Sequence, residues 1–173
     1  MRALWTPGHT PGHLCFYDER RELLLSGDHV LPRISPNISL HPQQPDNPLG
    51  HYRRSLTGLL GLSVAEVLPG HEYRFSGLAE RVAELLAHHE ARLAEIVELL
   101  RATPDSTTWD LTTRLTWSRP WSQITGYIRR AAVGETLAHL ALLAAEGRAT
   151  RTGQRPARWA IDEGQRTVVS DSR

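Results

Sequence analysis

The sequence predicts an α/β protein in which a larger unit of strands and helices is followed by a small α+β unit. Three observations carry this prediction. Three short apolar runs stop at Gly or Pro-Gly, and each is followed directly by His or Asp. Two longer stretches carry apolar residues at helical spacing. A Pro-containing break at residues 103–105 separates these from shorter helical segments and a hairpin pattern.

The first apolar run, residues 3–5, leads into two tandem Thr-Pro-Gly-His units that end at His9 and His13. Proline fixes φ and glycine allows backbone angles closed to other residues, so a tight loop between two strands is expected. Such a loop can hold an imidazole in one place at the end of a sheet, as a metal ligand requires. A polar turn that happens to contain His is the alternative.

Two more strands are expected after this loop. Residues 14–17 form the first, residues 18–22 a charged turn, and residues 23–25 the second, which ends at Gly27-Asp28. This hairpin brings the Asp28 carboxylate back beside His9. Cys15 lies in the first of these strands and is expected to be a buried strand residue rather than a nucleophile.

Residues 30–48 are rich in Pro and show no periodicity, which predicts a long loop over the site whose apolar residues could line a substrate pocket. A helix capped by Asp46 or Asn47 follows and ends at Gly61. Its apolar face is predicted to be Leu49, Tyr52, Leu56, Leu59 and Leu60. Residues 64–68 then form a short strand that delivers Pro69-Gly70-His71.

A long helix is predicted from Ser76 or Gly77 to about Ala102. Its apolar stripe is Leu78, Val82, Leu85, His89, Leu93, Ile96 and Leu100. For His88 and His89, a place at the edge of the core or in solvent is favoured over metal binding.

Beyond the break at 103–105, residues 106–110 resemble a capping box at the start of a short helix that runs to Leu115 or Trp117. A segment at 124–128 and a helix at 131–146 follow, and residues 149–155 with 158–161 predict a hairpin. Three helices and a hairpin are typical of a winged helix. We therefore expect units at 1–102 and 103–165, with a disordered tail at 166–173.

The ordered series TPGHTPGH, GD and PGHEY resembles the metallo-β-lactamase fold superfamily, especially its glyoxalase II-like hydrolases with a winged helix. The resemblance implies the C-terminal half of an αββα sandwich and two zinc ions per complete chain. It implies that His9 ligates the first metal, His71 the second, and Asp28 both, with Asp28 as the catalytic bridge. Imidazole nitrogen and carboxylate oxygen suit zinc or a similar divalent ion.

The superfamily's upstream His-x-His-x-Asp-His motif does not occur in this sequence. Each ion would keep two protein ligands, and catalytic zinc usually has three plus water. We therefore expect an N-terminally truncated enzyme that is inactive as an isolated chain. His13 is expected to act as an outer brace rather than a ligand. His29 is expected either to line the pocket or to be a bystander, and Tyr73 to shape the rim.

Three functions remain open. The first is a dinuclear-zinc hydrolase in which metal-bound hydroxide attacks an ester or thioester. The second is an endoribonuclease-type phosphodiesterase whose winged helix holds RNA. The third is a catalytically inactive interaction fragment.

Charge and composition limit the partners. Residues 1–100 carry nine Arg against twelve acidic residues, and residues 101–173 carry eleven Arg against seven. This small basic excess is weak support for nucleic-acid binding. Acidic residues lie among the Arg residues, and no series of aromatic residues accompanies them for bases to stack on. We therefore favour a small-molecule substrate over nucleic acid. The winged helix is expected to pack on the hydrolase half or on a second subunit in a homodimer.

The chain holds one Cys and no Lys, and 40% of its residues are apolar. One Cys excludes an internal disulfide and fits a reducing compartment, so a cytoplasmic location is expected. Because no apolar run approaches the roughly 20 residues that a membrane span needs, no membrane partner is expected.

Overall fold

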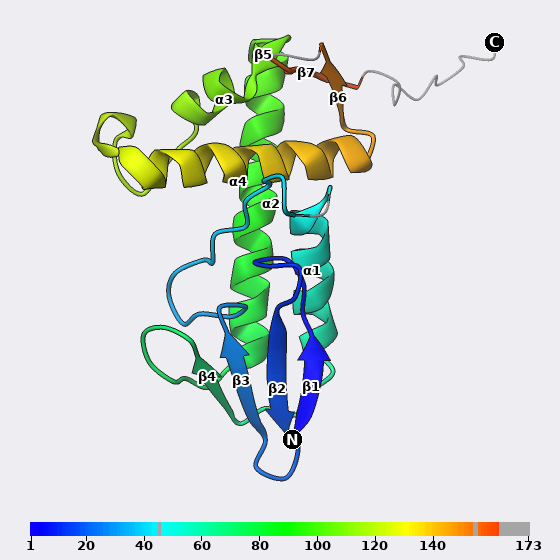
Figure 1. The fold of residues 1–173 in the computed structure, drawn as a ribbon, viewed down its shortest axis with the longest axis vertical. Helices are drawn as coiled ribbons and strands as arrows, with labels where there is room; N and C mark the ends of the chain where they lie inside the picture. Colours follow the sequence, from blue (N-terminus) through cyan, green and yellow to red (C-terminus); the bar gives the residue numbers. More distant parts are fainter. Residues whose placement is uncertain (45, 154–155, 163–173) are drawn as a thin grey trace, which may run out of the picture.

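The computed structural model describes residues 1–44, 46–153 and 156–162. Its first half holds a four-stranded sheet in the order β1-β2-β3-β4 (Figure 1). The strands are β1 (Arg2–Trp5), β2 (Leu14–Asp18), β3 (Leu23–Gly27) and β4 (Glu66–Pro69). β2 is antiparallel to both β1 and β3, and β4 is parallel to β3. β1, β3 and β4 therefore run in one direction, and their carboxyl ends meet at the upper edge of the sheet in Figure 1.

Two helices, α1 (Pro48–Leu59) and α2 (Leu78–Ala102), accompany this sheet. α1 begins where predicted, because the side chain of Asn47 accepts a hydrogen bond of 2.9 Å from the Gly50 amide. All seven members of the predicted α2 stripe are buried, from Leu78 to Leu100. Leu60 departs from the prediction: it lies just after the last residue of α1 and is 47% exposed.

The sheet is apolar on both faces. Alternate residues of β2 and β3, including Cys15, Tyr17 and Leu24, are buried in the core that the helices share. Trp5 and Leu14 pair across β1 and β2 on the other face, as Phe16 and Leu25 do across β2 and β3. Trp5, Leu14 and Phe16 remain exposed there (Trp5 at 69%), so this apolar face has water against it in the described part of the chain.

The second half contains α3 (Thr108–Arg114), a 3₁₀ turn (Trp121–Gln123), α4 (Gly126–Ala145) and three short strands. The strands are β5 (Ser106–Thr107), β6 (Ala149–Thr152) and β7 (Arg158–Ile161), in the order β5-β7-β6 with antiparallel pairing. The predicted capping box is confirmed, because Thr107 and Asp110 exchange hydrogen bonds at the start of α3.

Two details of the predicted second half are wrong. The segment at 124–128 is not a separate element, because α4 begins at Gly126 and continues without a break through residue 131. β5 was not predicted at all, since a two-residue strand has no periodicity and exists only through its pairing with β7. The expected tail at 166–173 lies outside the described residues, as do the ends of the predicted hairpin loop and of the 103–165 unit.

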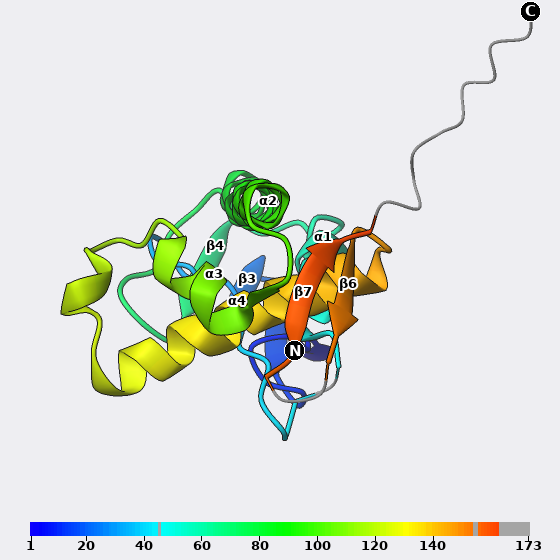
Figure 2. The same ribbon diagram turned by 90° about the horizontal axis from the view of Figure 1, so that it is seen from above.

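α2 joins the two halves. It runs the height of the molecule beside the four-stranded sheet and reaches the three-stranded one, and α4 crosses it (Figures 1 and 2). One apolar core extends across residue 103, from Leu24 and Val67 through Leu93 and Leu100 to Trp159. The boundary at 103–105 coincides with the end of α2, and the independence of the units on either side stays a prediction. Within the described ranges, no helix is both long enough and apolar enough to span a bilayer.

Candidate metal site at the edge of the four-stranded sheet

The three predicted ligands meet at the carboxyl edge of the sheet. His9 lies in the loop after β1, Asp28 directly after β3, and His71 two residues after the end of β4. His9 Nε2 is 3.7 Å from Asp28 Oδ2, and His71 Nε2 is 3.2 Å from Asp28 Oδ1. The two oxygens of one carboxylate therefore face two different imidazoles. The parallel direction of β1, β3 and β4 is what places all three side chains together.

The ring of His9 is held from its far side. Its Nδ1 is 2.9 Å from the main-chain carbonyl oxygen of Asn37. A carbonyl oxygen only accepts hydrogen bonds, so Nδ1 carries the proton in the neutral ring and Nε2 keeps its lone pair on the Asp28 side. The His9 carbonyl also accepts a 3.0 Å hydrogen bond from the side chain of Gln44. The long loop thus fixes both the ring and the backbone of His9.

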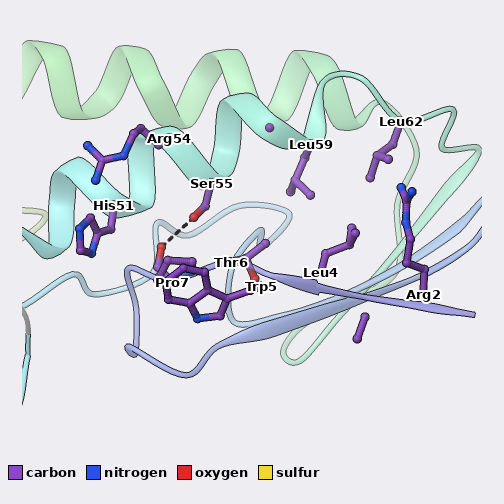
Figure 3. A pocket seen from close by; sticks show the side chains of 12 residues that line it. Arg2, Leu4, Trp5, Thr6, Pro7, His51, Arg54, Ser55, Leu59 and Leu62 are labelled. Carbon is purple, nitrogen blue, oxygen red and sulfur yellow. Dashed lines mark hydrogen bonds between the residues drawn. The ribbon is translucent and has the colours of Figure 1, made fainter.

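The loop that carries His9 is anchored at both ends and in the middle. The Thr6 amide donates to the His13 carbonyl at 2.9 Å, and the Thr6 hydroxyl hydrogen-bonds with His13 Nδ1 at 2.8 Å. Ser55 of α1 donates to the Pro7 carbonyl at 2.9 Å, the dashed contact in Figure 3. A Cβ on Gly8 would lie 2.4 Å from Tyr52 Cβ, so only glycine allows this approach to α1.

The other two ligand loops are equally close-packed. A Cβ on Gly70 would lie 2.7 Å from Asp28 Oδ1, so the glycine before His71 makes room for the carboxylate. Beside His71, the Glu72 carboxylate accepts hydrogen bonds from the amide and the guanidinium of Arg33 at 3.1–3.2 Å. This pair ties the long loop to the β4–α2 loop. The His71 side chain itself is 66% exposed, so the site is open to solvent on that side.

The remaining predicted residues surround the three ligands without contacting them as ligands do. His13 braces the first loop through Thr6, and its pKa is lowered by burial and then by the nearby His9. His29 is fully buried, and both of its ring nitrogens lack a hydrogen-bond partner. It packs between His13 and Tyr52, and burial lowers its pKa to about 3. Tyr73 is half exposed, with the Arg33 guanidinium 5.5 Å from its ring centre.

Cys15 is buried in β2, as predicted. Burial raises the pKa of its thiol to about 11, and the Thr6 hydroxyl 3.3 Å away only partly offsets this. A thiol in this state is protonated at neutral pH. Cys15 therefore supplies no thiolate nucleophile to the site.

The Asp28 carboxylate lies between the two imidazoles, and each of its oxygens faces one ring nitrogen. Among residues 1–44, 46–153 and 156–162, no three His, Cys, Asp or Glu side chains form one group that could hold a metal. Each Asp28 oxygen pairs with one imidazole nitrogen, so each pair presents one nitrogen and one oxygen atom. Nitrogen and carboxylate oxygen donors of this kind fit zinc. The outward-facing Nδ1 of His9 bonds to a carbonyl, as ligand histidines commonly do.

A cavity of about 580 Å³ lies on the other side of the first loop, between β1 and α1 (Figure 3). Leu4, Trp5 and Leu59 form its apolar wall, and Arg2 and Arg54 stand at its two ends. Thr6 and Pro7 also line it, but none of the three ligand side chains does. It is therefore not the space in which the ligands meet.

Sequence reasoning expected Glu72, with Tyr73, to brace or shape the rim beside His71, but it missed Asn37 and Gln44 as supports of the site. Asn37 acts through a main-chain carbonyl, for which the residue type is no signal. Gln44 lies on a loop without periodicity, and its partner comes from a distant loop. The only signal was the length and Pro content of the 30–48 loop, which predicted that it covers the site.

Comparison with known proteins supports a metallo-β-lactamase-like fold. Residues 1–71 match the model of the Metallo-beta-lactamase superfamily. The chain is 33% identical over 100 residues to the lactamase-like protein adaB of Aspergillus niger, which covers 58% of this chain and 29% of that protein. It is 26% identical over 147 residues to the beta-lactamase-like protein 2 homolog of Caenorhabditis elegans, which covers 85% and 45%.

Two solved structures are similar over nearly the whole chain. A metallo-beta-lactamase family protein from Thermus thermophilus is 39% identical with a TM-score of 0.80, covering 92% of this chain and 48% of that one. A beta-lactamase domain protein from Burkholderia ambifaria is 34% identical with a TM-score of 0.81, covering 92% and 47%. The fold is therefore metallo-β-lactamase-like, as the motifs predicted. The chain spans less than a third of the fungal relative and about half of each solved structure.

Proposed function

We propose that this metallo-β-lactamase-like chain is the C-terminal part of a metal-dependent hydrolase, in which His9, Asp28 and His71 help to hold two zinc ions. The proposed substrate is an ester or thioester. The observation that carries the proposal is the Asp28 carboxylate, whose two oxygens face His9 Nε2 and His71 Nε2 at 3.7 and 3.2 Å. A carboxylate used in this way can join two ions and leave one imidazole for each.

The proposed ligand set is incomplete within this chain, because two protein ligands per ion are fewer than a catalytic zinc usually has. We propose that the other ligands belong to a part of the protein outside these 173 residues. The similar structures, about twice as long as this chain, support this. We also propose a cytoplasmic enzyme, for which the single buried cysteine is the support.

Zinc bound at this edge would supply Lewis-acid activation of water and of the substrate carbonyl. The chain's own residues would set the geometry around it. Asp28 would contribute one carboxylate oxygen to each of the two positions. The Asn37 carbonyl would keep the proton of His9 on Nδ1. Exposed His71 leaves the site open to substrate, and Arg33 and Tyr73 stand beside it. A protein nucleophile is not needed, in keeping with the buried thiol of Cys15.

We propose that the second half is a winged-helix unit, which α2 precedes and contacts. The order α2-β5-α3-α4-β6-β7, with β7 in the middle of the sheet, supports this. In this arrangement α4 would be the helix that enters a DNA groove in nucleic-acid-binding members. Here its central part is covered, because Thr136, His139 and Leu140 are buried and the long loop lies against Gly134. The covered α4 supports a role as a wall of the site.

One observation favours the alternative of a nuclease. Trp109, Trp117 and Trp121 form a cluster with ring centres 5.6 and 6.3 Å apart around Trp121. The Arg129 guanidinium lies 5.2 Å from the Trp121 ring centre, and Tyr127 beside it is exposed. Exposed aromatic rings and Arg are what single-stranded nucleic acid stacks on. The sequence did not predict this cluster, and it gives the alternative a defined surface.

The hydrolase proposal is tested by assaying the complete gene product against an S-acyl thioester, a lactone and a phosphodiester. We expect turnover of the thioester or lactone that needs added Zn²⁺ and falls more than about 100-fold in Asp28→Ala, since losing even an outer-shell partner costs 10- to 100-fold. Cys15→Ala should keep its activity. Turnover of the phosphodiester alone would reverse the choice of substrate, and activity that survives Asp28→Ala would contradict the site.

Nucleic-acid binding is expected to be weak and non-specific. Short single-stranded RNA and duplex DNA should bind no more tightly than about 1 μM at physiological salt, because acidic residues interrupt the Arg residues of the second half. The measurement is a salt titration of fluorescence anisotropy with wild type and Trp109→Ala plus Arg129→Ala. Submicromolar RNA binding that this double variant abolishes would promote the nuclease.

A further inference from the structure

The long loop between β3 and α1 contacts α4 through the segment Asn37–Leu40, here called the strap. The Leu40 amide donates to the Gly134 carbonyl at 3.0 Å, and the Ser39 hydroxyl donates to the Ala131 carbonyl at 3.3 Å. Ile38, in the middle of the strap, is fully buried. The strap is therefore fixed to the second half of the molecule by hydrogen bonds to main-chain carbonyls and by an apolar anchor.

The contact between the strap and α4 depends on the close approach of Ser39 to Gly134. A Cβ built on Gly134 would lie 2.9 Å from Ser39 Cβ and 3.0 Å from Ser39 Oγ. Carbon atoms in native structures do not come so close, so any side chain at 134 moves the strap away from α4. The strap can therefore pack against this turn of α4 only because Gly134 has no side chain.

The strap also holds the first residue of the site. Asn37 presents its main-chain carbonyl to His9 Nδ1 at 2.9 Å, and its side-chain amide donates to the Glu135 carboxylate at 3.5 Å. The Asn37 side-chain oxygen also lies against the Ser39 hydroxyl, whose single hydrogen it shares with the Ala131 carbonyl. Asn37 is therefore located by α4 and by its neighbour in the strap, and it in turn locates the imidazole of His9.

We propose that Asn37, Gly134 and Glu135 are positioning residues for His9, so that the second half of the molecule sets which imidazole nitrogen faces Asp28. The inference rests on the proposed metal function of His9. Without the Asn37 carbonyl, the ring is free to carry its proton on Nε2, the tautomer that exposed imidazole favours in water. Nε2 would then donate a hydrogen bond to Asp28 and could not ligate a metal.

The test compares Gly134→Ala with the matched control Gly58→Ala in the 173-residue chain. Gly58 is a helical glycine of α1 around which a Cβ would meet nothing within 4 Å. The ring nitrogens of His9 are observed by ¹⁵N-labelled two-bond correlation spectra at fixed pH. We expect the Nδ1–H tautomer in wild type and in Gly58→Ala, and a shift of the majority to Nε2–H in Gly134→Ala.

Two further variants keep the test decisive. Ser39→Gly removes the Cβ that an alanine at 134 would meet, so Gly134→Ala combined with Ser39→Gly should recover most of the Nδ1–H form. If Gly134→Ala does not fold by circular dichroism, Asn37→Ala replaces it, because this change breaks the link to Glu135 without overpacking. It should shift the tautomer in the same direction by a smaller amount.

Zinc titration separates this inference from the proposed function. We expect the zinc affinity of Gly134→Ala to be about tenfold or more below that of wild type, as for other outer-shell changes. An Nε2–H tautomer in wild-type His9, or an Nδ1–H population that Gly134→Ala leaves unchanged, would overturn the inference. A shifted tautomer with no zinc bound by wild type or by the complete protein would support the positioning and count against the metal function instead.

Discussion

Asp28→Ala is expected to remove nearly all of the zinc that the complete protein holds. Both proposed metal positions share this carboxylate, whereas His9 and His71 each serve one position. Losing either histidine should therefore remove about one ion, and losing Asp28 about two. The measurement is elemental analysis after exhaustive dialysis, with Glu19→Ala as the control. Glu19 is an exposed carboxylate in the turn between β2 and β3, at the opposite end of the sheet.

The isolated 173-residue chain is expected to bind zinc only weakly, because the ligands must be assembled in the folded state and each position has two protein donors. Competition with a chromophoric chelator measures this affinity. Tight binding of two ions by the isolated chain, or full zinc content in Asp28→Ala, would show that the ligand set is different from the one proposed.

The residues at the sheet edge could be predicted because short sequence motifs at the strand ends determine where they lie. β3 ends at Gly27 and β4 at Pro69, so Asp28 and His71 follow their strands within two residues. His9 comes four residues after the end of β1, in the first Thr-Pro-Gly-His unit. The hairpin of β2 and β3 makes β3 parallel to β1, which brings Asp28 to His9. α2 could be predicted because seven apolar-stripe residues keep one period over its whole length.

The supports of the site could not be predicted in the same way. Asn37 acts through its carbonyl, and Gly134 through the absence of a side chain, so neither function depends on a chemical group visible in the sequence. α4 was expected to start at 131, with residues 124–128 as a separate segment before it, whereas the helix begins at Gly126. A local contact accompanies the first turn of the helix: the Arg129 side chain donates to the Ile124 carbonyl, five residues earlier, at 2.7 Å.

The sequence pattern placed His89 on the apolar stripe of α2 but gave no indication of its hydrogen-bond partner. Its place in the apolar stripe of α2 predicted a site at the edge of the core, and the residue is 1% exposed. Its Nδ1 lies 3.1 Å from Nε2 of the equally buried His139 of α4, a partner that no sequence spacing indicates. The pair stands where α2 and α4 cross, next to the ring of Tyr52.

This pair has one arrangement of protons that satisfies its contacts. His139 Nδ1 lies 2.8 Å from the Glu135 carbonyl and must donate to it, so His139 Nε2 accepts from His89 Nδ1. His89 Nε2 then has no hydrogen-bond partner. Both rings are neutral in the native protein. Burial, more than any neighbour, lowers the pKa of each histidine below the value of exposed imidazole.

The native state is therefore expected to lose stability as the pH falls below about 6.5, the ordinary pKa of histidine in an unfolded chain. Below that pH the unfolded chain takes up protons that the folded pair refuses until the pH reaches its lowered pKa values. Each histidine then lowers the free energy of unfolding by up to about 1.4 kcal/mol per pH unit. Above pH 6.5 this contribution to stability is complete.

The cationic groups around the pair reinforce this direction, whereas the Glu135 carbonyl, which accepts from His139, raises the pKa of that ring and partly offsets the effect of burial. Arg92 and His88 of α2 and Arg53 of α1 are positive or can become so, and they further lower the pKa of both rings. Glu135 works in the opposite sense: burial raises its pKa, so the folded state keeps a proton that the unfolded state releases. This partly offsets the loss of stability as the pH falls toward the ordinary pKa of Glu, about 4.3.

Urea unfolding at pH 7.5, 6.5, 5.5 and 4.5 measures the effect, with His89→Met plus His139→Leu as the test variant. These side chains are close to histidine in volume and do not titrate, so the free energy of unfolding should fall much less between pH 6.5 and 4.5 than in wild type. Some slope should remain, because buried His29 keeps its lowered pKa. His41→Ala, at an exposed loop histidine, should behave as wild type. Equal slopes in wild type and the double variant would show that the buried pair is not what makes this fold sensitive to acid.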